Sequence, residues 1–186
     1  LVPFTLPLDE LDARAPLPHS QHDALRAVVI ALQAERAPLV HQSGADPGSR
    51  RLVVARAAAA LGEDLVRLAV DGLPTGAAEL DALLRLWSRE LVLAPVQIYA
   101  EVDDLAGPVL ARLADRLRGA LVVGSAGPLP ELGCPIEQVD VARPTAREQR
   151  DAWRSLVAAD DVTAARLSAQ FDLGVAAIED VARSAA

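Results

Sequence analysis

The sequence contains no lysine, no asparagine and no methionine, and its 186 residues include a single cysteine, Cys134. All eighteen basic residues are arginines, so no chemistry that needs a lysine amine is open to this chain. One cysteine excludes an internal disulfide, which fits a reducing compartment, and we expect a cytoplasmic protein. Because the chain starts at Leu1 and lacks methionine, we also expect a domain cut from a longer polypeptide.

Aromatic residues are scarce at 3%, whereas 52% of the residues are hydrophobic, so Ala, Leu and Val must fill the core and favour helices. No apolar run approaches the ~20 residues that a membrane helix needs, and the N-terminus does not resemble a signal peptide. The net charge of −8 opposes binding to DNA, RNA or an anionic membrane. The composition therefore predicts no nucleic acid and no membrane partner, and it favours a protein partner.

Strand-like and helix-like segments alternate along most of the chain. Five short apolar segments are typical of strands, at residues 38–43, 64–70, 96–102, 120–125 and 135–142. Four segments with helical periodicity accompany them, at residues 20–37, 51–62, 77–93 and 107–119. This rhythm predicts an α/β fold with a five-stranded parallel sheet flanked by helices.

The alternation stops after Val141, and residues 143–186 are typical of three short helices. Thr145 and Glu148 have the spacing of a capping box at the first of them, and Ser20 and Asp23 have it at the first helix of the chain. We therefore divide the chain into an extended arm or linker (1–19), an α/β domain (20–142) and a small all-helical domain (143–186).

The segment HQSGADPGSRR, residues 41–51, has the length and the glycines of a phosphate-binding loop, and it lies between a predicted strand and a predicted helix. The usual pattern is G-x-x-x-x-G-K-[ST]. Its backbone N–H groups cradle the phosphates, its lysine reaches the outer phosphates, and its hydroxyl group holds Mg²⁺. The segment therefore raises the question of a nucleotide site.

Three of the four fixed positions of that pattern are changed. Gly44 stands at the first glycine, whereas Ser49, Arg50 and Arg51 replace the second glycine, the lysine and the hydroxyl residue. A shifted register keeps Gly48 as the second glycine but puts Ser49 at the lysine position. The loop has the shape of a phosphate-binding loop without its chemistry.

An open parallel sheet, a loop after its first strand, an acidic strand end about fifty residues later and a terminal three-helix domain together resemble the AAA+ ATPase module, a P-loop NTPase. RPTAREQRDAWRSLV, residues 143–157, looks like the start of an AAA+ lid, and AQFDLGVAAIEDVA, residues 169–182, looks like its later helix. The resemblance covers residues 20–186, so that 20–142 is AAA+-like and 143–186 is its lid. It is nearest to the N-terminal module of bacterial tandem ATPase proteins, some of which accompany contractile injection systems.

The resemblance implies a site for ATP or ADP with Mg²⁺. Glu101, in QIYAEVDDL, stands at the catalytic glutamate of the Walker B motif in one register and near the metal-supporting aspartate in another. Asp103 and Asp104 follow it as substitutes for the metal-holding carboxylate, or as a solvated acidic turn. The positions that would contact nucleotide are Gly44, Gly48, Ser49, Arg50, Arg51 and Ser125, the last as the first sensor.

Several of the family's functional groups are missing at once. A guanidinium at position 50 does not fit a cradle built for an ammonium, and Arg51 cannot coordinate Mg²⁺. Residues 120–142 contain no arginine to act as a finger, and Glu179 stands where the second sensor is normally arginine. Because phosphoryl transfer depends on positioning and charge stabilisation, we predict a degenerate module whose affinity for nucleotide and Mg²⁺ is weak or lost. We expect a structural or protein-interaction module, whose partners are other domains of its own longer chain, further copies of itself or a protein complex.

Three alternatives stay open: a divergent but active ATPase that uses Arg50 and Glu101, a nucleotide-binding switch without hydrolysis, and an unrelated doubly wound domain with a small ligand at its strand ends. A helical lid over the strand ends favours every interpretation except the last. If the site is degenerate, we expect Arg50→Ala to leave the thermal midpoint and any response to ATP unchanged.

Overall fold

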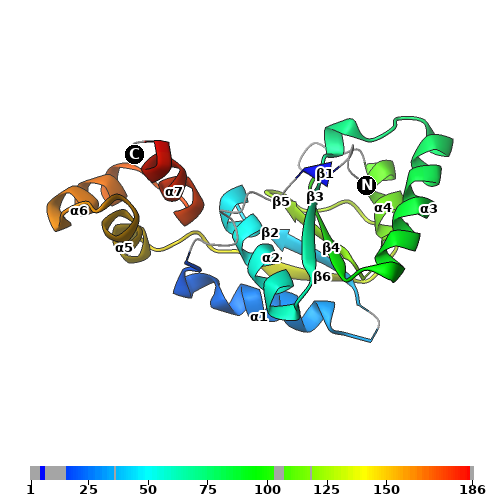
Figure 1. Cartoon of the computed structure of the whole chain (residues 1–186), viewed down its shortest axis with the longest axis horizontal. Helices are drawn as coiled ribbons and strands as arrows, with labels where there is room; N and C mark the ends of the chain where they lie inside the picture. Colours follow the sequence, from blue (N-terminus) through cyan, green and yellow to red (C-terminus); the bar gives the residue numbers. More distant parts are fainter. Residues whose placement is uncertain (1–4, 7–15, 36, 103–106, 118, 185–186) are drawn as a thin grey trace.

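A computed structural model describes residues 5–6, 16–35, 37–102, 107–117 and 119–184 (Figure 1). Its strands are β1 (Thr5–Leu6), β2 (Leu39–Ser43), β3 (Asp64–Leu68), β4 (Val96–Glu101), β5 (Leu121–Ser125) and β6 (Ile136–Asp140). Its helices are α1 (His22–Leu32), α2 (Pro47–Leu61), α3 (Ala77–Leu93), α4 (Gly107–Arg116), α5 (Ala146–Val157), α6 (Asp161–Gln170) and α7 (Val175–Ser184), with short 3₁₀ helices at His19–Gln21 and Val70–Gly72. Among these described residues, no helix is both long enough and apolar enough to cross a membrane.

The strands form one sheet in the order β1-β3-β4-β5-β2-β6. Strands β2 to β6 run parallel to one another, which confirms the predicted five-stranded parallel sheet. Strand β1 is an addition, because Thr5 and Leu6 pair antiparallel with Leu68 and Arg67 at the edge of β3. Two residues of the segment that we predicted to be an arm are therefore part of the sheet. The rest of residues 1–15 lies outside the described part of the chain.

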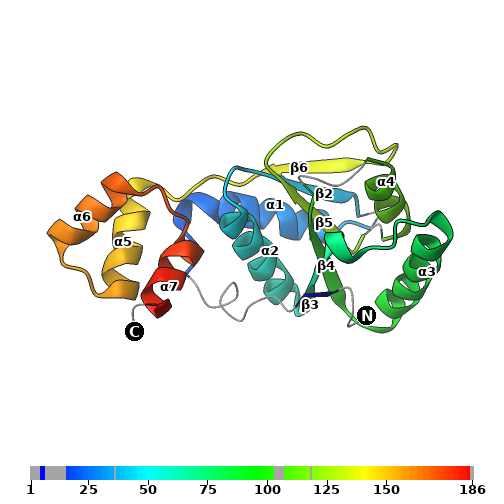
Figure 2. The same ribbon diagram turned by 90° about the horizontal axis from the view of Figure 1, so that it is seen from above.

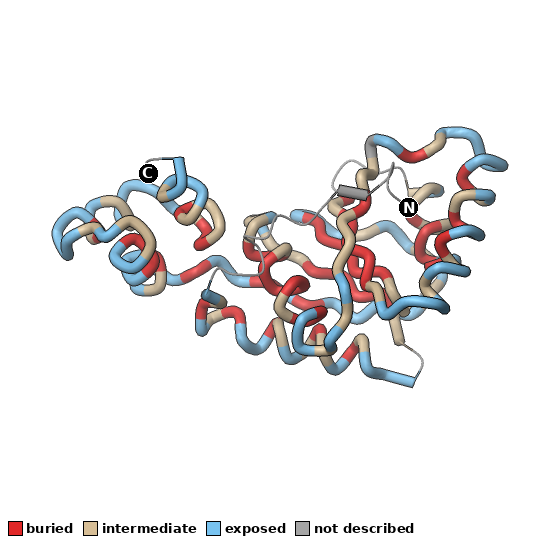
Figure 3. Tube along the Cα trace, viewed as in Figure 1, coloured by how far each residue is buried: buried red, intermediate tan, exposed pale blue. Residues whose placement is uncertain are grey.

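Helices cover both faces of the sheet, α1 and α2 on one face and α3 and α4 on the other (Figures 1 and 2). Successive strand residues point to opposite faces, so Leu39 and Leu121 enter the core beneath α3 and α4. Their neighbours Val40 and Val122 enter the core beneath α1 and α2. Both faces of the central strands are thus buried, as a parallel sheet requires (Figure 3).

Helix α2 begins earlier than the sequence pattern predicted, at Pro47. Asp46 precedes it with extended backbone and accepts a hydrogen bond from the N–H of Ser49, and proline suits the first helical position. Gly48 and Arg50 therefore lie in the first turn of a helix rather than in a loop. This cap fixes the direction in which the arginine side chain leaves the backbone.

Helices α5 to α7 pack around a small core of their own that contains Trp153 and Ile178. Leu52 of α2 joins this core and so attaches the helical domain to the sheet domain beyond the start of α2 (Figure 2). The three helices and the capping box of Thr145 and Glu148 confirm what the sequence predicted for this segment.

The capping box predicted for Ser20 and Asp23 is wrong. Gln21 precedes α1 and makes no side-chain cap, while Ser20 donates from its N–H and its hydroxyl to the carboxylate of Glu148, each at 2.8 Å. Burial alone raises the pKa of Glu148, but hydrogen bonds from Ser20 and Thr145 outweigh it and lower the pKa to about 2. One carboxylate thus caps α5 and ties it to the start of α1.

Glu148→Gln should lower the free energy of unfolding at neutral pH by about 1–2 kcal/mol, because the amide cannot accept every bond that the carboxylate accepts. A carboxyl group with a depressed folded pKa stabilises the protein above its unfolded pKa and loses that effect as the pH falls toward the folded value. The difference between wild type and variant in urea unfolding should therefore shrink between about pH 5 and pH 2. Glu137→Gln, at an exposed position of β6, is the control. A difference for Glu148→Gln that stays constant with pH contradicts the assignment.

Candidate functional site

The strand order β4-β5-β2 places the carboxyl ends of three strands side by side at one edge of the sheet. Ser43 of β2 is in register with Ser125 of β5, and Glu101 of β4 is in register with Gly124 of β5. Gly44 begins the loop at the same edge and donates its N–H to the carbonyl of Ser125. The structure thus brings together three positions that the sequence assigned to one nucleotide site from distant segments.

Arg50 lies at the centre of this group. Its side chain has no exposed surface, and its Nη2 atom lies 2.6 Å from Oε2 of Glu101, whose side chain is 17% exposed. Its Nη1 atom donates to the backbone carbonyl of Gly44. Arg50 therefore points inward and pairs with Glu101.

Tyr99, which the sequence analysis did not single out, forms a further hydrogen bond to Glu101 of this ion pair. Its buried hydroxyl donates to Oε1 of Glu101 at 2.6 Å, so each carboxylate oxygen accepts a bond. Burial and the charge of Glu101 raise the pKa of Tyr99 well above its ordinary value. Burial lowers the pKa of Arg50, but its bonds and its attraction to Glu101 outweigh burial and raise that pKa overall. The guanidinium stays charged and the phenol stays protonated at physiological pH.

Gly124 makes room for this arrangement. A Cβ atom on Gly124 would overlap the hydroxyl of Tyr99 and would lie 3.1 Å from Nε of Arg50. A glycine inside a buried strand often marks such a close approach. The sequence carried this signal in LVVGS, residues 121–125, but its partners were visible only once the strands were ordered.

The N-terminus of α2, where a phosphate would bind, is occupied by the chain itself. The carboxylate of Asp46 accepts hydrogen bonds from the N–H of Ser49 at 3.0 Å and from its hydroxyl at 2.5 Å. An anion is stabilised at a helix start by the free N–H groups and the helix dipole, and here Asp46 supplies it. The Ser49 hydroxyl also accepts a bond from Gln21 at 2.8 Å. The pair Asp46–Pro47 is a readable helix start that the loop alignment obscured.

Two backbone segments, at Val141 and at Gly174, pack closely against the loop between β2 and α2. A Cβ on Gly44 would overlap the carbonyl oxygen of Val141, and a Cβ on Gly174, just before α7, would overlap the carboxylate of Asp46. On the same side, a Cβ on Gly48 would lie 3.4 Å from the side chain of Ala176 in α7. The helical domain therefore reaches the loop through the start of α7, and glycines permit the approach.

Ser125, predicted as the first sensor, is already engaged. Nε2 of the buried His41 lies 2.8 Å from its hydroxyl oxygen, and that hydroxyl donates to the carbonyl of Gly127. Since a hydroxyl has one proton, Ser125 accepts from His41, which fixes the proton on Nε2. Burial and then the charge of Arg50 lower the pKa of His41, against the opposing effect of Asp140. A neutral histidine thus holds the serine in place.

The predicted metal ligands Asp103 and Asp104 lie outside the described residues. In the described part of the chain, no group of three or more His, Cys, Asp or Glu side chains is arranged to hold a metal ion. Arg51, at the position of the hydroxyl residue, has its Nη1 atom 4.0 Å from Oε1 of Glu101 and offers no oxygen to a cation.

If the nucleotide site is degenerate, Arg50→Ala was expected to leave the thermal midpoint unchanged, but the burial of Arg50 leads us to expect a loss of stability instead. Removing one partner of a buried ion pair strands the other, at a cost of about 3–5 kcal/mol. Because Glu101 is partly exposed, we expect Arg50→Ala to lower the free energy of unfolding by about 3 kcal/mol in urea denaturation. The double variant Arg50→Ala, Glu101→Ala should lose clearly less than the sum of the single variants. Strict additivity contradicts the pairing.

Gly124→Ala should lower the free energy of unfolding by about 1–3 kcal/mol, because the new methyl group displaces Tyr99 and Arg50. Gly127→Ala is the matched control, since a Cβ at Gly127 meets nothing within 4 Å. The comparison needs only the thermal midpoints of the two variants. Equal midpoints for both variants would show that the space above Gly124 is not needed.

The sequence matches no known family model and no curated protein. An assignment of function must therefore depend on the geometry of the strand ends. At the strand ends, Arg50 is paired with Glu101, and Asp46 accepts the hydrogen bond from the N–H of Ser49.

Proposed function

We propose that this chain is a degenerate AAA+-like module that does not hydrolyse ATP and acts in the cytoplasm as a structural or protein-interaction module of a longer ATPase chain. The observation that carries the proposal is the ion pair of Arg50 and Glu101 at 2.6 Å. It occupies the two positions that resemble the lysine and the carboxylate of an ATPase site. Each group is committed to the other rather than to a ligand.

Energetics favour the paired state. A phosphate that recruited Arg50 would have to break its bonds to Glu101 and to the Gly44 carbonyl, leaving a largely buried carboxylate without its cation. It would also have to displace the carboxylate of Asp46 from the start of α2, where like charges would repel. Arg50 and the N–H of Ser49, which could each contact a phosphate, already have partners within the chain.

The layout of the sheet supports the AAA+ interpretation over a dinucleotide-binding fold. Numbered among themselves in chain order, the five parallel strands have the order 2-3-4-1-5. This differs from the orders 3-2-1-4-5-6 and 2-1-3-4-5 of the common doubly wound folds. The contact of Gly174 with Asp46 also brings the helical domain to the loop, as a lid requires.

The alternative, a divergent ATPase that uses Arg50 and Glu101, finds less support. A general base has to be positioned toward the attacking water, whereas bonds from Arg50 and Tyr99 hold both oxygens of Glu101 toward groups of the chain itself. Phosphate release that requires Mg²⁺ and is abolished by Glu101→Gln would establish this alternative in place of ours.

Calorimetric titration with ATP and with ADP, each with and without Mg²⁺, tests the proposal directly. We expect no heat of binding up to millimolar nucleotide and no shift of the melting temperature, because the ligand must compete with covalently tethered groups. Micromolar binding overturns the proposal. Asp46→Ser, which keeps a capping oxygen but removes the charge, then shows whether the nucleotide sits at the loop. Asp160→Ser, at the equivalent cap of α6, is the control.

A further inference from the structure

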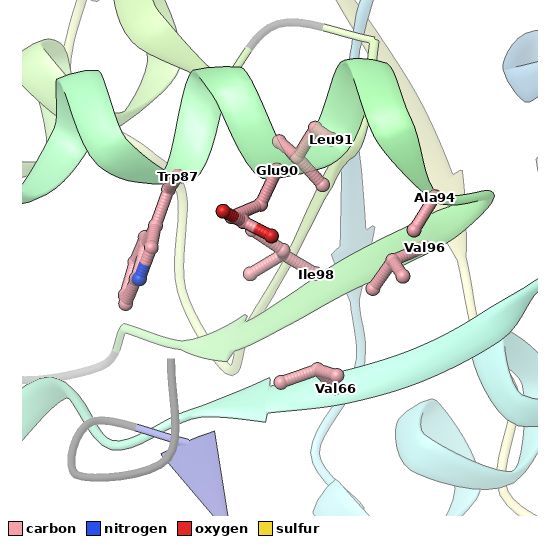
Figure 4. A pocket seen from close by; sticks show the side chains of 7 residues that line it. All are labelled: Val66, Trp87, Glu90, Leu91, Ala94, Val96 and Ile98. Carbon is pink, nitrogen blue, oxygen red and sulfur yellow. The ribbon is translucent and has the colours of Figure 1, made fainter.

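A small apolar pocket lies between the second half of α3 and strands β3 and β4 (Figure 4). It includes the first residue of β4, whereas the loop between β2 and α2 lies at the opposite, carboxyl ends of the strands. Its volume is about 50 Å³, and its apolar lining residues are Val66, Trp87, Leu91, Ala94, Val96 and Ile98. A pocket of this size accepts part of one aliphatic side chain, whereas cofactors occupy pockets of roughly 300–1,000 Å³.

Glu90 also lines this pocket and brings a negative charge to it. Figure 4 shows its carboxylate pointing from α3 into the pocket, toward Ile98 of β4. Within the described part of the chain, this carboxylate has no hydrogen-bond donor and no cation as its partner, and Arg89, next to it in the sequence, forms no ion pair with it. A carboxylate beside apolar groups is stabilised when a cation pairs with it. The pocket therefore presents apolar walls and an acceptor for a positive charge.

The end of α3 adds to the negative potential at the pocket. The last turn of the helix carries no basic residue, although its free carbonyl groups and the helix dipole favour a cation there. Asp64 of β3 is in register with Val96, so the two side chains lie on the same face of the sheet. The carboxylate of Asp64 has no partner among the described residues either. A cation that reaches Glu90 would be attracted by all of these groups.

Apolar side chains continue the surface beyond the pocket. Val92 and Leu93 follow the lining residue Leu91 in the last turn of α3, and they are 85% and 78% exposed. A ligand that carries apolar groups next to its positive charge would therefore bury them against the end of the helix. A free metal ion or a small inorganic cation would leave this surface uncovered.

From these features we infer that the pocket binds a basic side chain of a partner protein, lysine or arginine, that has apolar residues beside it in the partner's sequence. The aliphatic stem of that side chain lies against Val96 and Ile98, because long basic side chains bury their stems along apolar surface. Its positive head pairs with Glu90, and its apolar neighbours contact Val92 and Leu93. The chain carries a net charge of −8 and no lysine, so a basic partner complements it. The inference does not depend on the fate of the nucleotide site.

Titration with the peptide acetyl-Leu-Lys-Leu-amide, followed by NMR, tests the inference. The chain has two tryptophans, of which Trp87 lines the pocket and Trp153 lies in the core of α5 to α7. We expect the indole N–H signal of Trp87 to shift with peptide concentration until it saturates, while the signal of Trp153 stays in place. The same peptide with norleucine in place of lysine keeps the stem without the charge, and it should shift neither signal.

Glu90→Gln keeps the size of the side chain and removes its charge, so it should weaken peptide binding about fivefold, the upper end for an ion pair open to solvent. Glu79→Gln, at an exposed position in the first turn of the same helix, is the matched control. Because the Glu90 carboxylate has no partner within the described residues, the thermal midpoint of Glu90→Gln should equal that of the wild type.

Leu93→Ser should weaken binding of the peptide and leave binding of n-butylammonium, which has only the stem and the charge, unchanged. A titration without a saturable shift of Trp87 overturns the inference. So does a norleucine peptide that binds equally well, or a Glu90→Gln variant with the affinity of the wild type. If n-butylammonium binds as tightly as the peptide, the pocket takes a free amine, and the assignment to a protein segment is wrong.

Discussion

The ion pair between Arg50 and Glu101 is the interaction on which the arrangement of the strand ends depends. It joins the first turn of α2 to the end of β4 across the intervening strand β5, where Gly124 leaves space for it. A buried ion pair offsets its desolvation only when its remaining groups are hydrogen-bonded. Tyr99 supplies such a bond to Glu101, and the carbonyl of Gly44 supplies one to Arg50. The loop, the glycine in β5 and the tyrosine in β4 thus all contact one charged pair.

The sequence has no lysine, and in the structure an arginine, Arg50, makes the central charged contact of the strand ends. The planar guanidinium donates in fixed, diverging directions, and Arg50 uses two of its nitrogens to reach a carbonyl on one side and a carboxylate on the other. A lysine ammonium is a compact charge on a flexible stem and does not bridge two such acceptors with the same fixed geometry. The arginine at position 50 is therefore the residue that builds the cross-strand link. The absence of lysine from the sequence and the contacts of Arg50 are thus consistent with each other.

The sequence predicted the fold more fully than the site. Hydrophobic periodicity located the five parallel strands and the helices, because strand and helix periods are local properties, and Thr145 with Glu148 marked a helix start. The pairing of Arg50 with Glu101 was hidden, since it depends on strand order and on the helix starting at Pro47. The sequence pattern therefore assigned the first turn of α2 to a loop. For the same reason the bond of Ser20 to Glu148 was mistaken for a local cap: residues far apart in the chain share no pattern that spacing can reveal.

The charged and polar groups at the strand ends have their partners within the chain rather than in a bound ligand. A module that needs nucleotide to satisfy its loop gains stability in proportion to the logarithm of ligand concentration. Here Asp46 supplies the anion at α2 and Glu101 supplies the counter-charge, so the loop can be ordered at any nucleotide concentration. The open apolar surface lies instead at the amino end of β4, beside Trp87 and Leu93. The edge at which the parallel strands end is thus closed by side chains of the chain itself, and the apolar pocket beside α3 lies away from it.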